Sequence, residues 1–150
     1  MSKLMPIELI ARGVCIADGK LLMCHTKGAR NTYLPGGHIE CHESAKESLC
    51  REIKEELGKK AITGRFLGAV EHTFKRHGKR YCEINLLFDL KIKGIDPSEN
   101  PCSCEDHIEF WWEPLKKIAR SKLEPSVLRK VLMTWLGNDG VEAWASTWDE

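Results

Sequence analysis

One helix can be located in this sequence from its two ends, and it constrains the fold more than any other segment. Ser44 and Glu47 stand three residues apart in the pattern of a capping box, and Gly58 supplies a stop at the other end. Apolar residues recur between them at helical spacing, namely Leu49, Cys50, Ile53 and Leu57. The pattern predicts an amphipathic helix between Ser44 and Gly58 that packs one side against a core.

Strand patterns flank this helix on both sides. Asp18-Gly19 between two apolar, partly β-branched runs, Glu8–Ile16 and Lys20–Thr26, predicts that these runs form a hairpin. Pro35-Gly36-Gly37 is expected to break any regular element. The other expected elements are strands at Ile62–Phe74, Tyr81–Ile92 and Glu109–Glu113, a turn at Lys75–Arg80, a loop at Lys93–His107, a helical turn at Pro114-Leu115 and a helix at Pro125–Leu136. This order predicts an α/β (α+β) fold with a mixed β-sheet sandwiched between helices, in one domain over residues 1–150.

Composition narrows the functional class. The chain has 150 residues, 42% hydrophobic and 30% charged, with a net charge of +1, which is typical of a globular protein. The near-zero net charge argues against binding to nucleic acid or a membrane through bulk electrostatics. No apolar run approaches the ~18 residues of a membrane span, and no signal peptide is evident, so we expect a cytoplasmic protein.

The cysteines indicate reduced thiols. Their number, seven, is odd, and no export signal accompanies them. Cys102, Cys104 and His107 resemble a fragment of a zinc site, but the CxxC pairs typical of structural zinc are absent. Small loop and core thiols are therefore the favoured interpretation.

Three glutamates crowd one side of the predicted helix. Glu52 is an i,i+3 neighbour of Glu55 and an i,i+4 neighbour of Glu56, and like charges at these spacings repel. One interpretation is a solvated acidic face, relieved by Arg51 and Lys59. The other is an all-oxygen site for Mg²⁺ or Mn²⁺, ions that keep open positions for a substrate phosphate. The glycine loop before the helix, which also carries Glu40 and Glu43, favours the metal interpretation, because glycine lets a backbone carbonyl approach an ion.

The segment Gly37–Lys59 resembles the Nudix box, G-x5-E-x7-R-E-U-x-E-E-x-G-U, in which U is a bulky aliphatic residue. Eight of the nine positions agree, the exception being Lys59, which stands where an aliphatic residue is usual. Cys41-His42 also stand where many members have Pro-Gly. The nine positions are Gly37, Glu43, Arg51, Glu52, Ile53, Glu55, Glu56, Gly58 and Lys59. The flanking elements also suit a Nudix fold over most of the chain.

The resemblance implies a metal-dependent hydrolase that cleaves a diphosphate linkage in a nucleoside diphosphate derivative or a similar compound. It implies that Mg²⁺ or Mn²⁺ binds to Glu52, Glu55, Glu56 and the Gly37 carbonyl, with Glu52 a base in some members and a ligand only in others. It also implies that Arg51 orients the helix carboxylates and that Glu43 and Gly58 are structural. A further acid from a distant loop completes the site in several members, and Glu105 is the first candidate here, with Glu109 second.

Substrate contacts are less constrained by the sequence. Lys27 and Arg30 precede the box and are candidates to bind phosphate, although ordinary solvated loop charge explains them equally well. Phe74, Trp111 and Trp112 are candidates to stack on a base, but strand aromatics are more often core residues. Trp144 and Trp148, on the polar carboxy-terminal tail, either pack on the body or form a dimer contact. A homodimer is compatible with the family resemblance.

Three other functions remain as alternatives. The first is a catalytically silent Nudix-fold sensor or scaffold that binds a nucleotide; such modules usually lose the box acids that this chain keeps. The second is isoprenyl diphosphate isomerisation, whose extra cysteine and glutamate positions are not found here. The third is RNA decapping, which the lack of a basic surface bias disfavours.

Overall fold

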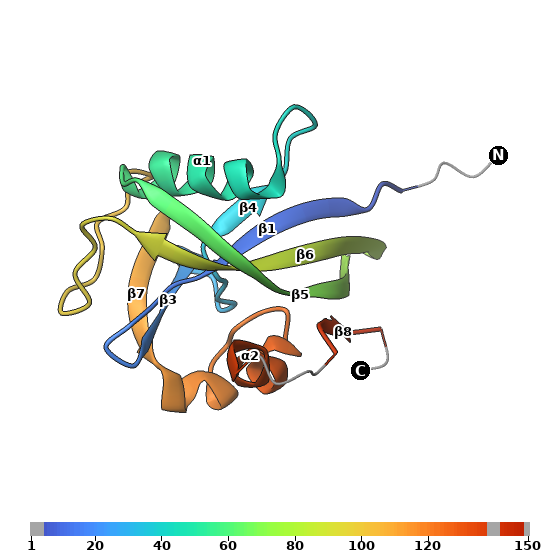
Figure 1. Cartoon of the computed structure of the whole chain (residues 1–150). Helices are drawn as coiled ribbons and strands as arrows, with labels where there is room; N and C mark the ends of the chain where they lie inside the picture. The colour runs from blue at the N-terminus through green and yellow to red at the C-terminus, as the bar shows by residue number, and fades with distance from the viewer. Residues whose placement is uncertain (1–4, 138–141, 149–150) are drawn as a thin grey trace.

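Within residues 5–137 and 142–148, the part of the chain that the computed structural model describes, a mixed sheet of five strands forms the centre of the fold (Figure 1). Its strands, in spatial order, are β4 (Gly36–His38), β1 (Glu8–Val14), β6 (Lys79–Ile92), β5 (Ala61–Arg76) and β8 (Trp144–Ser146). β1 runs antiparallel to β4 and parallel to β6. β5 runs antiparallel to β6 and parallel to β8.

A second, antiparallel sheet packs beside the first. In the described part of the chain it has three strands, β2 (Ile16–Ala17), β3 (Lys20–Thr26) and β7 (Ile108–Pro114). The helical elements are α1 (Ala45–Leu57), a 3₁₀ helix η1 (Leu115–Arg120) and α2 (Leu128–Gly137). Figure 1 shows α1 on one side of the five-stranded sheet and α2 on the other. The prediction of a mixed sheet between helices is confirmed.

The core has two parts, one under each helix, because successive residues of a strand face opposite sides of the sheet. On β6, for example, Leu87 belongs to the cluster that contains α2, and Phe88 belongs to the cluster that contains α1. On β1, Ala11 faces α1 and Val14 faces α2, and both are fully buried. β1 is therefore an inner strand that is covered on both faces.

Helix α1 forms as predicted, with both halves of its capping box present. The Ser44 hydroxyl accepts a hydrogen bond from the Glu47 backbone, and the Glu47 carboxylate accepts one from the Ser44 backbone. Gly58 ends the helix in the left-handed conformation, with φ of 65°, which glycine adopts at low cost. Leu49 and Ile53 are fully buried, so the predicted inner face is confirmed.

The predicted opening hairpin is only partly correct. Asp18 and Gly19, both with positive φ, form the tight turn, but the paired residues before it are only Ile16 and Ala17. The earlier part of the run, β1, pairs with β4 and β6 instead. Because β1 is buried on both faces, pairing with β4 and β6 is more favourable for it than pairing with the neighbouring strand β3.

The prediction that Pro35-Gly36-Gly37 breaks regular structure is wrong, because Gly36–His38 forms β4. Gly36 has a φ of 140°, and a Cβ there would clash with the backbone oxygen of Ala11. Glycine is therefore what allows this segment to pair with β1.

Two further boundaries differ from the predictions. The expected turn Lys75–Arg80 is shorter, because β5 and β6 continue to Arg76 and Lys79, leaving His77 and Gly78 with positive φ as the turn. The last helix begins at Leu128 rather than Pro125, and the Leu128 backbone N–H bonds to Pro125 across a preceding turn. The loop before β7 and the helical turn after it agree with the predictions.

The carboxy-terminal tail packs on the body through β8. Ala145 is buried against β5, whereas Trp144 and Trp148 stay 46% and 45% exposed. The guanidinium of Arg80 lies over the Trp148 ring, 4.7 Å from its centroid. Residues 138–141 and 149–150 of the predicted tail lie outside the described residues. Among the helices that the structure describes, none has the length and apolar character needed to span a membrane.

Candidate active site

The three glutamates of α1 have very different environments, although they share one side of the helix. The Glu55 side chain is 51% exposed, the Glu52 side chain is 16% exposed, and Glu56 is buried with 8% exposure. Lys59, which the solvated-face interpretation paired with these acids, instead donates a hydrogen bond to the backbone oxygen of Gly94. The acidic face is therefore not simply a solvated surface.

Arg51 links the loop before α1 to these carboxylates. Its Nε and Nη2 atoms donate to the two oxygens of Glu43 at 2.9 and 2.7 Å. Its Nη1 atom donates to Glu52 at 3.1 Å and to Glu55 at 3.3 Å, and Nη2 also reaches the backbone oxygen of His38. Hydrogen bonds from Arg51 lower the pKa of Glu43 to about 2, and the same pairing raises the pKa of Arg51.

Glu56 carries the most unusual carboxyl group of the described residues. Its Oε2 atom is buried and has no hydrogen-bond partner among these residues, and the carboxyl group of Glu52 is a close neighbour. Burial raises the pKa of Glu56 to about 8, and the charges of Glu52 and Glu105 act in the same direction. The positive charge of Arg12 opposes the shift.

Gly37 lies directly against the Glu52 carboxyl group. A Cβ added at Gly37 would lie 2.5 Å from Oε1 of Glu52. Glycine at this position therefore lets the β4 backbone approach the Glu52 carboxylate as closely as it does. The Glu52 side chain of α1 and the Gly37 backbone of β4 are therefore neighbours.

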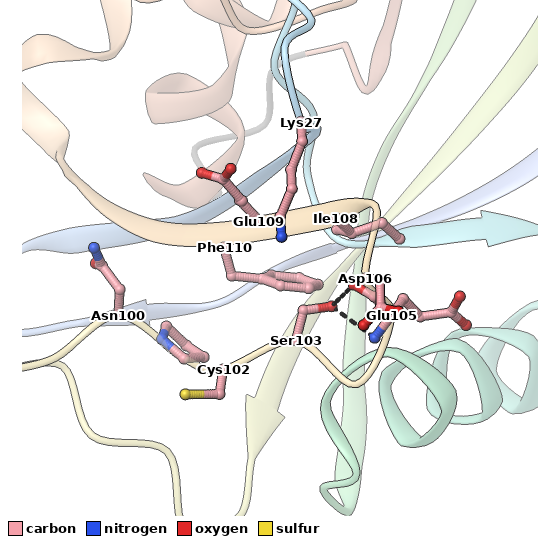
Figure 2. A pocket seen from close by; sticks show the side chains of 10 residues that line it. Lys27, Asn100, Cys102, Ser103, Glu105, Asp106, Ile108, Glu109 and Phe110 are labelled. Atoms are coloured by element: carbon pink, nitrogen blue, oxygen red, sulfur yellow. Dashed lines mark hydrogen bonds between the residues drawn. The ribbon is translucent and has the colours of Figure 1, made fainter.

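The loop before β7 is hydrogen-bonded to the carboxyl end of α1. The backbone N–H of Cys104 donates to the Glu56 carbonyl at 2.7 Å, and the Ser103 hydroxyl lies 3.4 Å from the same oxygen. Figure 2 shows the Ser103 hydroxyl bonded to the backbone of Glu105, whose side chain extends toward α1 and away from Lys27. This arrangement brings the negative charge of Glu105 close enough to act on Glu56.

The sequence interpretation missed Arg12, the cation that acts on Glu56. Arg12 lies on β1, where its Nη1 atom donates to the Leu34 backbone at 3.0 Å and its guanidinium lies 5.4 Å from the centre of the Tyr33 ring. The signal was visible as a single charge inside the apolar strand ELIARGV. Its partner on the neighbouring strand, Asn85, is fully buried.

Arg12 also lines a cavity of about 630 Å³ on the α2 side of the five-stranded sheet. This volume is suitable for a small-molecule ligand. Lys27 and Arg30, the predicted phosphate contacts, are exposed and lie elsewhere. Lys27 lines a cavity of about 410 Å³ with Glu105 and Glu109 (Figure 2), and Arg30 lines an adjoining one beside β7.

The donor set at the end of α1 fits a divalent cation, although its side chains are not gathered around one point. Among the residues described, no three His, Cys, Asp or Glu side chains form a ready cluster for a metal ion. Arg51 holds Glu52 and Glu55 at its own guanidinium in this arrangement. Carboxylate and carbonyl oxygens are the ligand type that Mg²⁺ and Mn²⁺ favour, and the unpartnered oxygen of Glu56 and the backbone of Gly37 beside Glu52 are oxygen donors of this type.

The sequence is similar to those of several known proteins. The chain is 25% identical over 156 residues to an RNA pyrophosphohydrolase of Halorhodospira halophila, covering 92% of this chain and 85% of that protein. It is 32% identical over 87 residues to an ADP-ribose pyrophosphatase of Methanocaldococcus jannaschii, covering 55% of this chain. The chain spans 33% and 49% of the length of two of its curated relatives.

Solved structures show the same fold. The crystal structure of a MutT protein from Methanosarcina mazei Go1 aligns with a TM-score of 0.70 and 24% identity, covering 93% of this chain and 100% of that one. The family model of the NUDIX domain matches residues 8–135, which include every element from β1 to most of α2. The chain therefore belongs to the NUDIX domain family.

Proposed function

We propose that this protein is a metal-dependent hydrolase of a diphosphate linkage in a nucleoside diphosphate derivative or a similar compound. Membership of the NUDIX family supports the reaction class. The names of two relatives, an RNA pyrophosphohydrolase and an ADP-ribose pyrophosphatase, are in keeping with cleavage of a diphosphate.

The observation that carries the proposal is the buried Glu56 carboxyl group. Its Oε2 atom has no hydrogen-bond partner among the described residues, and a second carboxyl group, that of Glu52, adjoins it. An unpartnered buried carboxyl group next to another one destabilises the fold by itself. A cation bound to both carboxylates and to a substrate phosphate neutralises the negative charges that otherwise destabilise the fold.

In this proposal Glu52, Glu55, Glu56, Glu105 and the Gly37 carbonyl hold Mg²⁺ or Mn²⁺. When bound, the metal lowers the pKa of an attacking water and neutralises charge on the phosphate. The structure supports these assignments through the position of Gly37 against Glu52 and through the effect of Glu105 on Glu56.

The protein's own groups supply the rest of the chemistry. Arg51, anchored by Glu43, fixes the orientation of the helix carboxylates, and Gly58 ends the helix so that the Cys104 loop can pack there. A carboxylate of the Glu52–Glu56 pair accepts the proton of the attacking water. Arg12 offers positive charge beside this pair, and Lys27 and Arg30 are proposed as outer contacts to the substrate phosphates.

The test is a panel of diphosphate compounds assayed with Mg²⁺ and Mn²⁺, with the products identified by mass. We expect two phosphorylated products from at least one compound, and Glu56→Gln is expected to fold normally and to lose most of the turnover. A wild-type protein that binds nucleotides and cleaves none of the compounds would identify the sensor alternative instead. Full activity of Glu56→Gln would remove the site from the reaction.

We propose a single catalytic domain, a homodimer and a cytoplasmic location. The match of the family model to residues 8–135 supports the single domain. Light scattering during size-exclusion chromatography measures the oligomeric state directly.

A further inference from the structure

The cavity of about 630 Å³ beside Arg12 has the chemistry of a nucleobase site. Two of its lining residues, Arg12 and His38, belong to the β1–β4 pairing around Gly37, and Gly37 lies against the Glu52 carboxylate. A substrate whose diphosphate lies at the carboxylates can therefore place its organic group in this cavity. The inference rests on the proposed function, because it names the part of the substrate that the cavity takes.

Three rings form one wall of the cavity. His72 and Phe74 of β5 are stacked with their centroids 5.3 Å apart, and Phe74 and Tyr81 of β6 are stacked at 5.5 Å. Phe74 and Tyr81 are direct partners in the β5–β6 ladder, so the pairing of the strands fixes their positions. All three rings are half-buried and keep surface on the cavity side. Such a row of rings is suited to stacking with a flat aromatic group.

Glu83 supplies a hydrogen-bond acceptor at the same wall. It is opposite His72 in the β5–β6 ladder, it lines the cavity, and it is buried with 8% exposure. Asn85 donates to Oε1 of Glu83 at 3.0 Å. Because Arg12 can only donate, the Asn85 oxygen faces Arg12 and its NH₂ group faces Glu83. Oε1 therefore already accepts one hydrogen bond, and no hydrogen bond joins Oε2 to another described residue.

The other carboxylates of this cavity differ from Glu83 because each has a basic partner. Glu8 contacts the His38 ring nitrogen at 3.2 Å, and Glu124 is paired with Arg129 at 3.1 Å. The remaining charges at the cavity are the cations Arg12, Lys75 and Arg76. Glu83, bonded to a neutral amide, is the acceptor that is available to a ligand.

We propose that this cavity binds the base of a nucleotide that carries an exocyclic amino group. The base stacks on the ring wall, and its amino group donates to Oε2 of Glu83. A base without that amino group leaves this largely buried carboxylate without that donor, so it binds more weakly. Glu83 is thus a specificity-determining residue of the proposed hydrolase.

The test compares two nucleoside monophosphates that differ only in this group, adenosine 5′-monophosphate and purine riboside 5′-monophosphate. Calorimetric titration of the whole chain in the presence of EDTA measures their binding without turnover. We expect adenosine monophosphate to bind about tenfold more tightly or better. In Glu83→Gln we expect this preference to disappear, because the amide that Asn85 orients presents a donor to the cavity.

Glu71→Gln is the matched control. Glu71 precedes His72 on β5, does not line the cavity, and accepts a hydrogen bond from Ser146 that glutamine can keep. This variant is expected to retain the wild-type preference. Tyr81→Leu is expected to weaken both nucleotides while keeping their ratio.

Equal affinity of the wild-type protein for the two nucleotides, failure to bind either, or a preference that survives in Glu83→Gln would each overturn the inference. The wild-type comparison decides the matter even if a variant fails to fold, as a thermal melt would reveal. Turnover of the diphosphate panel is a separate measurement. Cleavage without base discrimination refutes this inference alone, whereas discrimination without cleavage refutes the proposed hydrolase.

Discussion

Arg51 donates two parallel hydrogen bonds to the Glu43 carboxylate, one from Nε at 2.9 Å and one from Nη2 at 2.7 Å. Paired contacts of this kind between a guanidinium and a carboxylate fix direction as well as distance. The same guanidinium holds Glu52. The loop between β4 and α1, which carries Glu43, is therefore coupled to the Glu52 carboxylate of α1 through one side chain.

The Arg51–Glu43 pair gives a prediction for stability against pH. The pKa of Glu43 is lowered from 4.5 to about 2 by the hydrogen bonds of Arg51. A carboxyl group whose pKa is lower in the native state than in the unfolded state stabilises the fold. This contribution is complete above the unfolded-state pKa and is lost as the pH falls through the native-state pKa. We therefore expect wild type to melt at a higher temperature than Glu43→Gln at pH 6, with the difference shrinking between pH 4.5 and 2. A constant difference down to pH 2 would contradict this origin.

The local signals explain why the centre of the site could be predicted from the sequence. The capping box at Ser44 and Glu47 and the stop at Gly58 act within a few residues, so α1 and its acidic face could be located without knowledge of the tertiary structure. Long-range pairing could not be predicted in the same way. The partners of β1 depend on burial of both its faces, and β4 depends on the close approach of Gly36 to Ala11.

The different environments of the glutamates also could not be predicted from the sequence. Glu55 and Glu56 are adjacent and chemically identical, yet the first is exposed and the second is buried. Adjacent residues of a helix project about 100° apart, and the loop that bonds to the Glu56 carbonyl through Cys104 comes from nearly fifty positions later in the chain. Arg12 was missed for the same reason, because a charge within a strand does not reveal what it faces.

Gly37→Ala should separate catalysis from folding. The added Cβ would lie 2.5 Å from the Glu52 carboxylate and displace it, whereas the backbone conformation is open to alanine. We expect unchanged circular dichroism and a loss of kcat of roughly 10- to 100-fold. Gly64→Ala is the control, because its Cβ would lie against Asp89, 3.1 Å from Oδ2 and 3.4 Å from the backbone oxygen, and would not meet the Glu52 carboxylate. Full activity of Gly37→Ala would show that the Glu52 carboxylate has freedom to move.

Metal should stabilise the wild-type protein in proportion to its binding. A ligand that binds only the native state stabilises it by about 2.7 kcal/mol at a free concentration near 100 times Kd. Millimolar Mg²⁺ or Mn²⁺ should therefore raise the melting temperature of wild type, and EDTA should reverse the rise. In Glu56→Gln we expect most of the shift to be lost. An equal shift in both proteins would place the metal elsewhere.

The two candidate loop acids can be told apart by substitution. Glu105 acts electrostatically on Glu56, whereas Glu109 is exposed on β7 and lies 3.6 Å from the His25 ring. Glu105→Gln is expected to lower kcat by roughly 10- to 100-fold and to weaken metal binding, as loss of a metal-site residue does. Glu109→Gln should stay close to wild type in the same steady-state assay. The reverse order of effects would assign the loop ligand to Glu109.

Arg12 should matter more to the reaction than the two cations that the sequence suggested. Its charge acts on Glu56, and it is fixed by the Leu34 carbonyl and the Tyr33 ring, whereas Lys27 and Arg30 are exposed at separate cavities. A preorganised cation near the reacting phosphate contributes more to the transition state than a solvated one does.

We therefore expect Arg12→Met to lower kcat/KM by roughly 10- to 100-fold, and Lys27→Met and Arg30→Met to cost clearly less. Steady-state kinetics at saturating Mg²⁺ measures the three variants, and thermal melts confirm that each one is folded. A loss in Lys27→Met as large as that in Arg12→Met would mean that the diphosphate extends into the cavity beside β7. In that case the substrate would cross the Glu105 loop rather than follow β1 toward Glu83.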